Sequence, residues 1–190
     1  MDYVVRKACE NDDYDIAKTL AYSFAKTLSI LTGDLERIVR IFEHGIATDC
    51  FYAAERNGEI IGVSACTDCK TGRALKATKI DCKKYLGFIR GTIAFKFICS
   101  GLMQELSWPE TTGYIDIVGV LEKARGKGVA KEMLKTITQN NPQYDEFILE
   151  TDSKNASAVK SYTDFGFVEF KREQVVKFVK RYRIFMRYTA

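Results

Sequence analysis

Two glycines and two cations open a predicted helix, which is expected to begin at Gly126 or Lys127, in the run Arg125, Gly126, Lys127, Gly128, Val129 and Ala130. Glycine lets a backbone approach a ligand closely, and the first amides of a helix have no partner within it. A helix start of this kind carries about half a positive charge and suits phosphate oxygens. Arg125 and Lys127 would add mobile charge beside it. The run therefore predicts an anion-binding site built mostly from backbone.

Other phosphate-binding loops fit this run poorly. A Walker A loop needs Ser or Thr after its lysine, but Lys127 is followed by Gly128. A dinucleotide fingerprint needs a third glycine where Lys131 stands, although Glu150, at the end of the next predicted strand, mimics its ribose-binding acid. A nicotinamide enzyme is thus a minor alternative. On this run alone, a basic glycine turn without a ligand stays open.

Two further motifs accompany the glycine run. An apolar strand, Ile117-Val118-Gly119-Val120, comes before it. Downstream, the pattern Asn155-x-x-Ala158-x-x-x-Tyr162-x-x-x-Gly166-Phe167 places its first three named residues on one helix face. Together, in this order and spacing, the three motifs resemble the GNAT superfamily of acyl-CoA-dependent N-acyltransferases. The motif residues run from Val118 to Phe167, and the order of predicted elements extends the resemblance across nearly the whole chain.

The resemblance implies a binding site for acetyl-CoA as cosubstrate, with no metal. The strand residues Val118, Gly119 and Val120 would border a gap between two splayed strands, where main-chain groups of Val118 and Val120 bind the pantetheine arm. The amides from Arg125 to Ala130 would hold the pyrophosphate. Asn155 would contact the pantetheine or its edge.

The resemblance also implies direct attack of an amine on the thioester, without an acyl-enzyme. An alkyl amine is only about one part in 2,500 neutral at pH 7, a deficit of about 4.6 kcal/mol. Asp116 should share a strand face with Val118 and is the first candidate for the base that offsets this deficit, since some family members carry Glu there. A solvated or hydrogen-bonded strand residue is the equally weighted alternative, and Tyr114 is the reserve candidate.

Tyr162 would face the thioester sulfur by the same resemblance. A phenol is protonated at neutral pH and can donate a hydrogen bond or a proton to the leaving thiolate. Full transfer to a thiol is uphill by about 2 kcal/mol at ordinary pKa values, so the expected role is to stabilise the thiolate. A non-catalytic module that senses acyl-CoA is the alternative function, because it would keep the glycine run without productive catalytic geometry.

The elements that must position these residues alternate between strands and helices. Asn57-Gly58 joins two β-prone runs and predicts a type I′ hairpin turn. The glycine run opens a helix between strands at 114–121 and 146–151, which implies a parallel pair joined by a crossover helix. The predicted fold is α/β, more closely an α+β mixed sheet of GNAT type: mostly antiparallel, with one splayed parallel pair, flanking helices and a helical insertion at about 67–113. The other predicted elements are strands at 3–8, 51–56, 59–65, 167–171 and 181–187, and helices near 16–24, 34–46 and 155–165.

The insertion is expected to contain one long helix, from the spacing of Leu86, Ile89, Ile93 and Phe97. Residues Leu86 to Met103 are apolar enough to raise the question of a membrane span. Arg90 and Lys96 lie inside the stretch, however, and each would cost about 2.5–3.5 kcal/mol at a bilayer centre. We therefore interpret it as a buried helix and expect no membrane association.

Bulk composition limits the remaining choices. A chain of 190 residues, 46% hydrophobic, predicts one domain over residues 1–190. The N-terminus shows no secretory signal, so a cytoplasmic protein with six reduced cysteines is expected. Cys66, Cys69 and Cys82 lack a fourth zinc ligand, because the single histidine, His44, stands far upstream.

The expected partner is a small-molecule or peptide amine acceptor. The formal charge of +4 is mild and spread thinly over 29 basic and 25 acidic residues. Basic residues from Lys171 to Arg183, Lys177 among them, are expected to form a solvated strand face rather than a nucleic-acid site. The sequence leaves a homodimer open.

Overall fold

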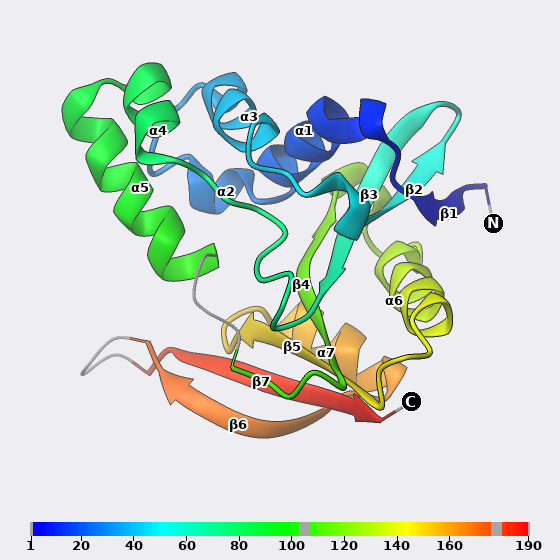
Figure 1. Cartoon of the computed structure of the whole chain (residues 1–190). Helices are drawn as coiled ribbons and strands as arrows, with labels where there is room; N and C mark the ends of the chain where they lie inside the picture. The colour runs from blue at the N-terminus through cyan, green and yellow to red at the C-terminus, as the bar shows by residue number, and fades with distance from the viewer. Residues whose placement is uncertain (1, 103–106, 176–179, 190) are drawn as a thin grey trace.

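The computed structural model describes residues 2–102, 107–175 and 180–189. Lys177 therefore lies outside the described residues. Seven strands form one sheet in the order β1-β2-β3-β4-β5-β7-β6 (Figure 1). The pair β4 and β5 is parallel and every other neighbouring pair is antiparallel. The strands are β1 (Val4–Lys7), β2 (Phe51–Arg56), β3 (Glu59–Thr67), β4 (Thr112–Val120), β5 (Glu146–Asp152), β6 (Val168–Gln174) and β7 (Tyr182–Thr189).

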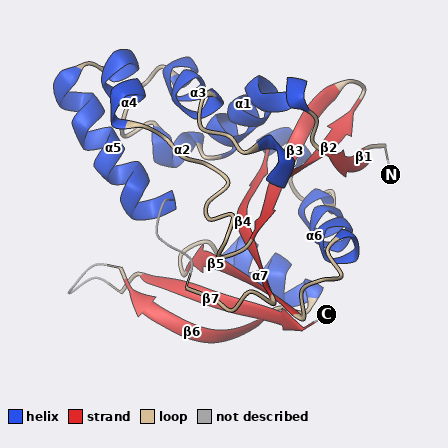
Figure 2. Ribbon diagram, in the orientation of Figure 1, coloured by secondary structure: helices blue, strands red, loops and turns tan. Residues whose placement is uncertain are grey.

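Helices cover both faces of this sheet, as Figure 2 shows. The first group packs on one face around Phe42, Phe51 and Ile117: α1 (Asp13–Ser23), α2 (Ala25–Leu28), α3 (Leu35–Glu43), α4 (Lys79–Leu86) and α5 (Phe88–Leu102). The second group, α6 (Val129–Asn140) and α7 (Ala156–Phe165), packs on the other face. The mixed sheet with one parallel pair and flanking helices confirms the predicted fold class.

Alternation along the strands explains how one sheet serves two cores. In β2, Phe51 and Ala53 belong to the cluster beneath α1 and α3, whereas Tyr52 and Ala54 face the α6 side. The turn between β2 and β3 has positive φ at Asn57 and Gly58, 51° and 77°. These angles are those of the predicted type I′ hairpin.

The insertion differs from the prediction in two ways. It contains two helices rather than one, because Gly87, with φ of 80°, ends α4 before α5 begins. The stripe expected to be buried is exposed, since Ile89 is 73% and Ile93 59% accessible. The inward face of α5 instead carries Ala94 and Ile98.

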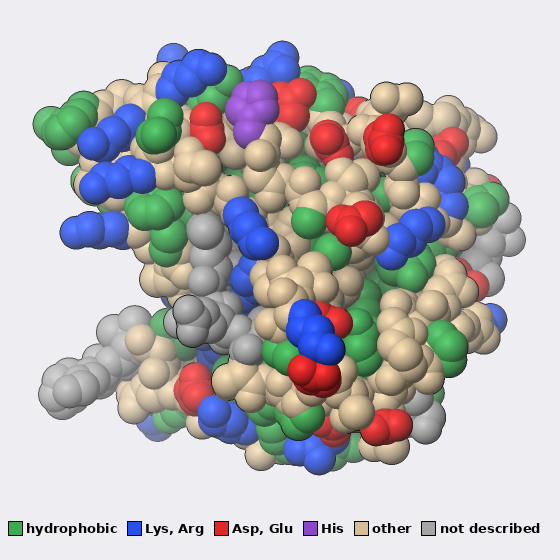
Figure 3. All heavy atoms as spheres, viewed as in Figure 1, with side chains coloured by type: hydrophobic (Ala, Val, Ile, Leu, Met, Phe, Trp, Pro, Cys, Tyr) green, Lys and Arg blue, Asp and Glu red, His purple; other side chains and the backbone are tan. Residues whose placement is uncertain are grey.

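A small residue explains which face of α5 turns inward. Gly91 packs so closely against α4 that a Cβ there would lie 2.4 Å from the carbonyl oxygen of Cys82. Apolar and basic side chains consequently lie together on the outer surface of α4 and α5, toward the left of Figure 3. No described helix has both the length and the apolar character that crossing a membrane requires.

Candidate active site

A gap opens between β4 and β5 partway along the two strands. They pair in parallel from Thr112 opposite Glu146 to Ile115 opposite Leu149. Beyond that point β4 continues to Val120, still paired with β3, while β5 continues to Asp152, paired with β7. The splayed parallel pair implied by the resemblance is therefore present.

The main chain of Val118 and Val120 faces this gap. The amide of Leu121 donates to the carbonyl of Ile61 on β3 at 3.0 Å. Because main-chain groups alternate in direction along a strand, those of Val120 and Val118 point away from β3. Those of Gly119 point toward β3, and an added Cβ there would lie 3.3 Å from Leu20 and Ser23 of α1. Gly119, which the resemblance places at the cofactor, thus provides room for the packing of α1.

The glycine run stands at the start of a helix, as the sequence predicts, but this helix begins at Val129 rather than at Gly126 or Lys127. Gly126 and Gly128 adopt φ of 72° and 79°, and the helix α6 begins at Val129. The first hydrogen bond into α6 runs from the amide of Glu132 to the carbonyl of Gly128 at 3.0 Å. Within the described part of the chain, none of the amides of residues 126 to 130 makes a well-formed hydrogen bond. These five amides are the backbone cradle expected for an anion.

The side chain of Arg125 does not supply mobile charge to this cradle. Its Nε donates to the carbonyl of Val120 at 3.1 Å, and its Nη2 donates to the carbonyl of Ser23 at 2.8 Å. The guanidinium therefore ties the end of β4 to the end of α1. The carbonyl of Val120 is used in this way. Of the two residues predicted to contact pantetheine, Val118 therefore has the more available main chain. The side chain of Lys127 is exposed beside the cradle.

Tyr162 lies in the core where the gap begins. It shares a cluster with Ile115 and Leu149, the last paired residues of β4 and β5, and its ring meets Phe167 edge-on at 6.2 Å. The side chain is buried, and this burial raises the pKa of Tyr162 to about 12. The phenol is therefore a hydrogen-bond donor throughout the physiological pH range.

Asn155 caps the helix that carries Tyr162. Its Oδ1 accepts from the amide of Ala158 at 3.3 Å and from the hydroxyl of Ser157 at 3.0 Å. This is the usual preference of Asn at a helix N-terminus. The side-chain oxygen of Asn155 is therefore engaged within the chain.

The prediction that Asp116 shares a strand face with Val118 is wrong. The four residues of β4 from Ile115 to Val118 oppose only the three residues of β3 from Ser64 to Cys66, so β4 carries a bulge. An extra residue resets the alternation of faces. Val118 packs toward α6, whereas Asp116 points to the opposite side.

The carboxylate of Asp116 is fully engaged there. Its Oδ1 bonds Nη1 of Arg73 at 2.5 Å, and its Oδ2 accepts from the amide of Ala74 at 2.7 Å. The side chain is only 1% accessible, and burial raises its pKa while Arg73 opposes that shift. The alternative of a hydrogen-bonded strand residue describes Asp116 better than a free base.

Arg73 also reaches β5. Its Nη2 bonds Oε1 of Glu150 at 3.1 Å, and Oε2 of Glu150 lies 3.4 Å from Nε of Arg183. Tyr114, the reserve candidate for the base, is buried beneath Arg73, with its ring centroid 4.9 Å from the guanidinium carbon. An acceptor cannot reach it there. No motif in the sequence marks Arg73, because it belongs to the insertion, where the pattern is weak.

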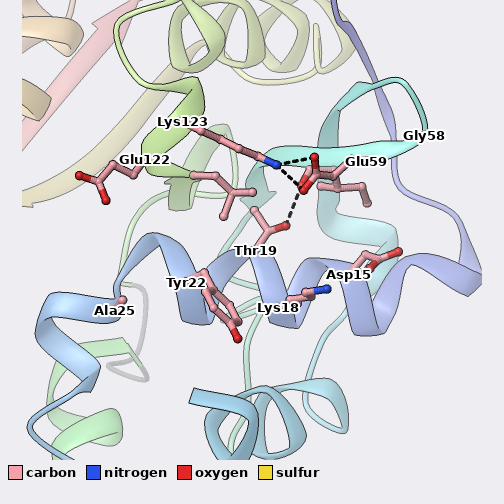
Figure 4. Close-up of a pocket in the computed structure, with 11 residues that line it drawn as sticks. Asp15, Lys18, Thr19, Tyr22, Ala25, Gly58, Glu59, Glu122 and Lys123 are labelled. Carbon is pink, nitrogen blue, oxygen red and sulfur yellow. Dashed lines mark hydrogen bonds and ion pairs between the residues drawn. The ribbon is translucent and has the colours of Figure 1, made fainter. Parts of the chain in front are cut away.

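A surface hollow lies elsewhere on the described part of the chain. A groove of about 740 Å³ runs between α1, the β2–β3 hairpin and the short 3₁₀ turn Glu122–Ala124 (Figure 4). Across it, Nζ of Lys123 bonds Oε1 of Glu59 at 2.6 Å. None of the residues predicted to contact the cofactor lines this groove. Among the described ranges, no cluster of His, Cys, Asp or Glu could hold a metal ion.

Comparison with known proteins agrees with this geometry. A family model described as the acetyltransferase (GNAT) family matches residues 21–167, more than half of the chain. A curated relative, N-alpha-acetyltransferase 30 of Saccharomyces cerevisiae, is 34% identical over 62 residues. Those residues are 32% of this chain and 35% of the relative, so the chain matches about a third of that protein's length.

Solved structures share the fold over nearly all of the chain. An N-acetyltransferase from Staphylococcus aureus Mu50 aligns with a TM-score of 0.66 at 16% identity, covering 97% of this chain and 100% of that one. The yncA protein of Salmonella typhimurium, solved with its cofactor acetyl-CoA, gives 0.62 at 16% identity, covering 100% and 94%. The NatC complex bound to Gag peptide and CoA gives 0.57 at 16% identity, covering 100% and 99%.

Proposed function

The chain belongs to the GNAT acetyltransferase family, and we propose that it transfers the acetyl group of acetyl-CoA to a primary amine of a small molecule or peptide. The observation that carries the proposal is the continuity of two sites along one strand. The gap beside Val118 and the amides of residues 126 to 130 are separated only by the end of β4 and a short turn.

The residues present fit coenzyme A. The amides of Gly126 to Ala130 would hold the pyrophosphate oxygens, because oriented N–H groups at a helix start favour anions. The main chain of Val118 would bind the pantetheine arm in the gap. Acetyl-CoA would supply the acetyl group as a thioester, at the end of the gap where Tyr162 lies.

Tyr162 is proposed to stabilise the leaving thiolate by hydrogen bonding. Its pKa of about 12 lies about 3.5 units above that of a thiol, so a complete proton transfer would cost about 4.8 kcal/mol. Donation of a hydrogen bond avoids that cost while still favouring the charged sulfur. The buried position of the phenol strengthens such a bond, because water competes less.

We do not assign the role of general base to Asp116, since both of its carboxylate oxygens have hydrogen-bond partners. The acceptor amine would then react from its small neutral fraction. The expected consequence is that kcat/KM rises about tenfold per pH unit below the pKa of the acceptor amine. A plateau set by a group of the enzyme near pH 6 or 7 would contradict this assignment and restore a base.

The test is release of free thiol from acetyl-CoA over a panel of amines. The panel includes peptides with free N-termini, because the curated relative is named for N-alpha-acetylation. Turnover with at least one amine supports the enzyme. Tight binding of CoA without turnover on any amine would instead support the acyl-CoA sensor.

A further inference from the structure

One arginine joins the two strands at the point where they part. The last parallel pair is Ile115 with Leu149, and the next residues along the two strands are Asp116 and Glu150. Arg73 bonds both carboxylates, through Nη1 at 2.5 Å and Nη2 at 3.1 Å. A side-chain bridge thus begins where the backbone pairing of β4 and β5 ends.

The backbone around Arg73 is held firmly. The amide of Ala74 donates to Asp116, and the carbonyl of Ala74 accepts from the amide of Ala47 at 2.9 Å. The amide of Lys76 donates to the carbonyl of Gly45 at 2.8 Å. Because these bonds fix the main chain that directly follows Arg73, the guanidinium has a defined position relative to β4.

Burial gives the bridge little freedom. The side chains of Arg73, Asp116 and Glu150 are 7%, 1% and 14% accessible. Buried charges are strongly disfavoured without their partners, so the three groups must stay together. The planar guanidinium reaches two carboxylates in a fixed geometry, which a lysine ammonium cannot reproduce. The separation of β4 and β5 at the start of the gap is therefore set by the size of this bridge.

We propose that Arg73 is a positioning residue that sets the width of the β4–β5 gap and thereby the seat of the pantetheine arm. This inference rests on the proposed use of acetyl-CoA. It concerns only the pantetheine half of the molecule, because Arg73 contacts the strands and not the glycine run. The nucleotide half should bind independently of the bridge.

The test compares two ligands, coenzyme A and adenosine 3′-phosphate 5′-diphosphate, which lacks the pantetheine arm. In Arg73→Lys the charge is kept but the double bridge is lost. We expect calorimetry to show that coenzyme A binds at least tenfold more weakly, while the nucleotide half binds within twofold of the wild type. Arg6→Lys is the matched control, since Arg6 of β1 also bridges two carboxylates, Asp12 in the short 3₁₀ turn before α1 and Glu55 on β2. It should change neither affinity.

A second variant covers the case in which Arg73→Lys fails to fold. The triple substitution Arg73→Met, Asp116→Asn and Glu150→Gln removes the bridge without leaving the two carboxylates charged, and the same selective loss is expected. Coenzyme A binding within twofold of the wild type in the folded variant would overturn the inference. An equal loss of affinity for both ligands would also overturn it, because that result would indicate general damage to the fold. Failure of the wild-type protein to bind either ligand would instead remove the proposed function itself.

Discussion

The glycine run and the Arg73 bridge border the same gap but are built in opposite ways. The run offers five backbone amides from residues adjacent in sequence, and residues 126 to 128 are exposed. The bridge consists of three largely buried side chains. In sequence, Arg73 lies 43 residues from Asp116 and 77 residues from Glu150. A backbone site needs only the right chain conformation, whereas a buried ionic site depends on every partner being present.

The first prediction, with the largest expected effect, compares two arginine bridges by stability. Arg73→Met leaves Asp116 and Glu150 without their main partner in the interior and should lower the free energy of unfolding by about 3–5 kcal/mol. Arg6→Met, at a site where Arg6 is 34% and Asp12 10% accessible, should cost about 1 kcal/mol. Urea denaturation measures both. Equal losses would show that burial does not distinguish the two bridges.

The second prediction concerns Tyr162, which lies where the gap begins. Tyr162→Phe removes the hydrogen bond to the leaving thiolate and should lower kcat about 100-fold, or about 2.7 kcal/mol. The affinity for coenzyme A should stay within twofold, because the cradle and the bridge are untouched. With a pKa of about 12, Tyr162 should also cause no loss of kcat between pH 8 and 10. An unchanged kcat in the variant would remove Tyr162 from the mechanism.

Different parts of this account could be read from the sequence to different degrees. The helix α6 begins at Val129, later than the predicted start at Gly126 or Lys127, because Gly126 and Gly128 adopt positive φ. The type I′ turn at Asn57-Gly58 follows from local rules, so it was predictable. The orientation of Asp116 was not, because a bulge inside β4 reversed it and no residue type marks that bulge. The exposed face of α5 was misjudged because Gly91, rather than the apolar stripe, decides its packing.

Side-chain roles were the least predictable. Arg125 has the charge expected near phosphate, but its guanidinium donates hydrogen bonds to the carbonyls of Val120 and Ser23 instead. Arg73 has no local signal, since its partners lie on strands that only the folded sheet brings together. The local chain thus predicts backbone sites well and long-range ionic contacts poorly.

The third prediction uses paired glycines to isolate the backbone cradle. Gly126 and Gly58 have φ of 72° and 77°, and in both an added Cβ would meet no atom within 4 Å. Alanine at either position should therefore cost a similar stability, about 1–2 kcal/mol. Only Gly126→Ala should weaken the binding of coenzyme A, by about tenfold, because the added methyl group would lie beside the amides that hold the pyrophosphate. Calorimetry measures the affinity of each variant for coenzyme A. Equal affinities would indicate that the anion binds elsewhere.

The fourth and smallest effect is a pH dependence at the Arg6 bridge. The hydrogen bond from Arg6 lowers the pKa of Asp12 to about 2, below its unfolded value. The stabilisation is therefore complete above about pH 5 and is lost as the pH falls toward 2, by about 1 kcal/mol after allowing for solvent. Urea denaturation of the wild type and Arg6→Met across this range measures the difference. A difference that does not shrink with falling pH would contradict the assignment.

The central claim is that coenzyme A binds through the amides at the start of α6 and the gap beside them. The most direct measurement is a backbone ¹H–¹⁵N spectrum of the ligand-free protein during titration with coenzyme A. We predict that the largest shifts fall on the amides of Gly126 to Ala130 and of Val118. An unchanged spectrum at millimolar coenzyme A, or shifts confined to the groove of Figure 4, would contradict the account.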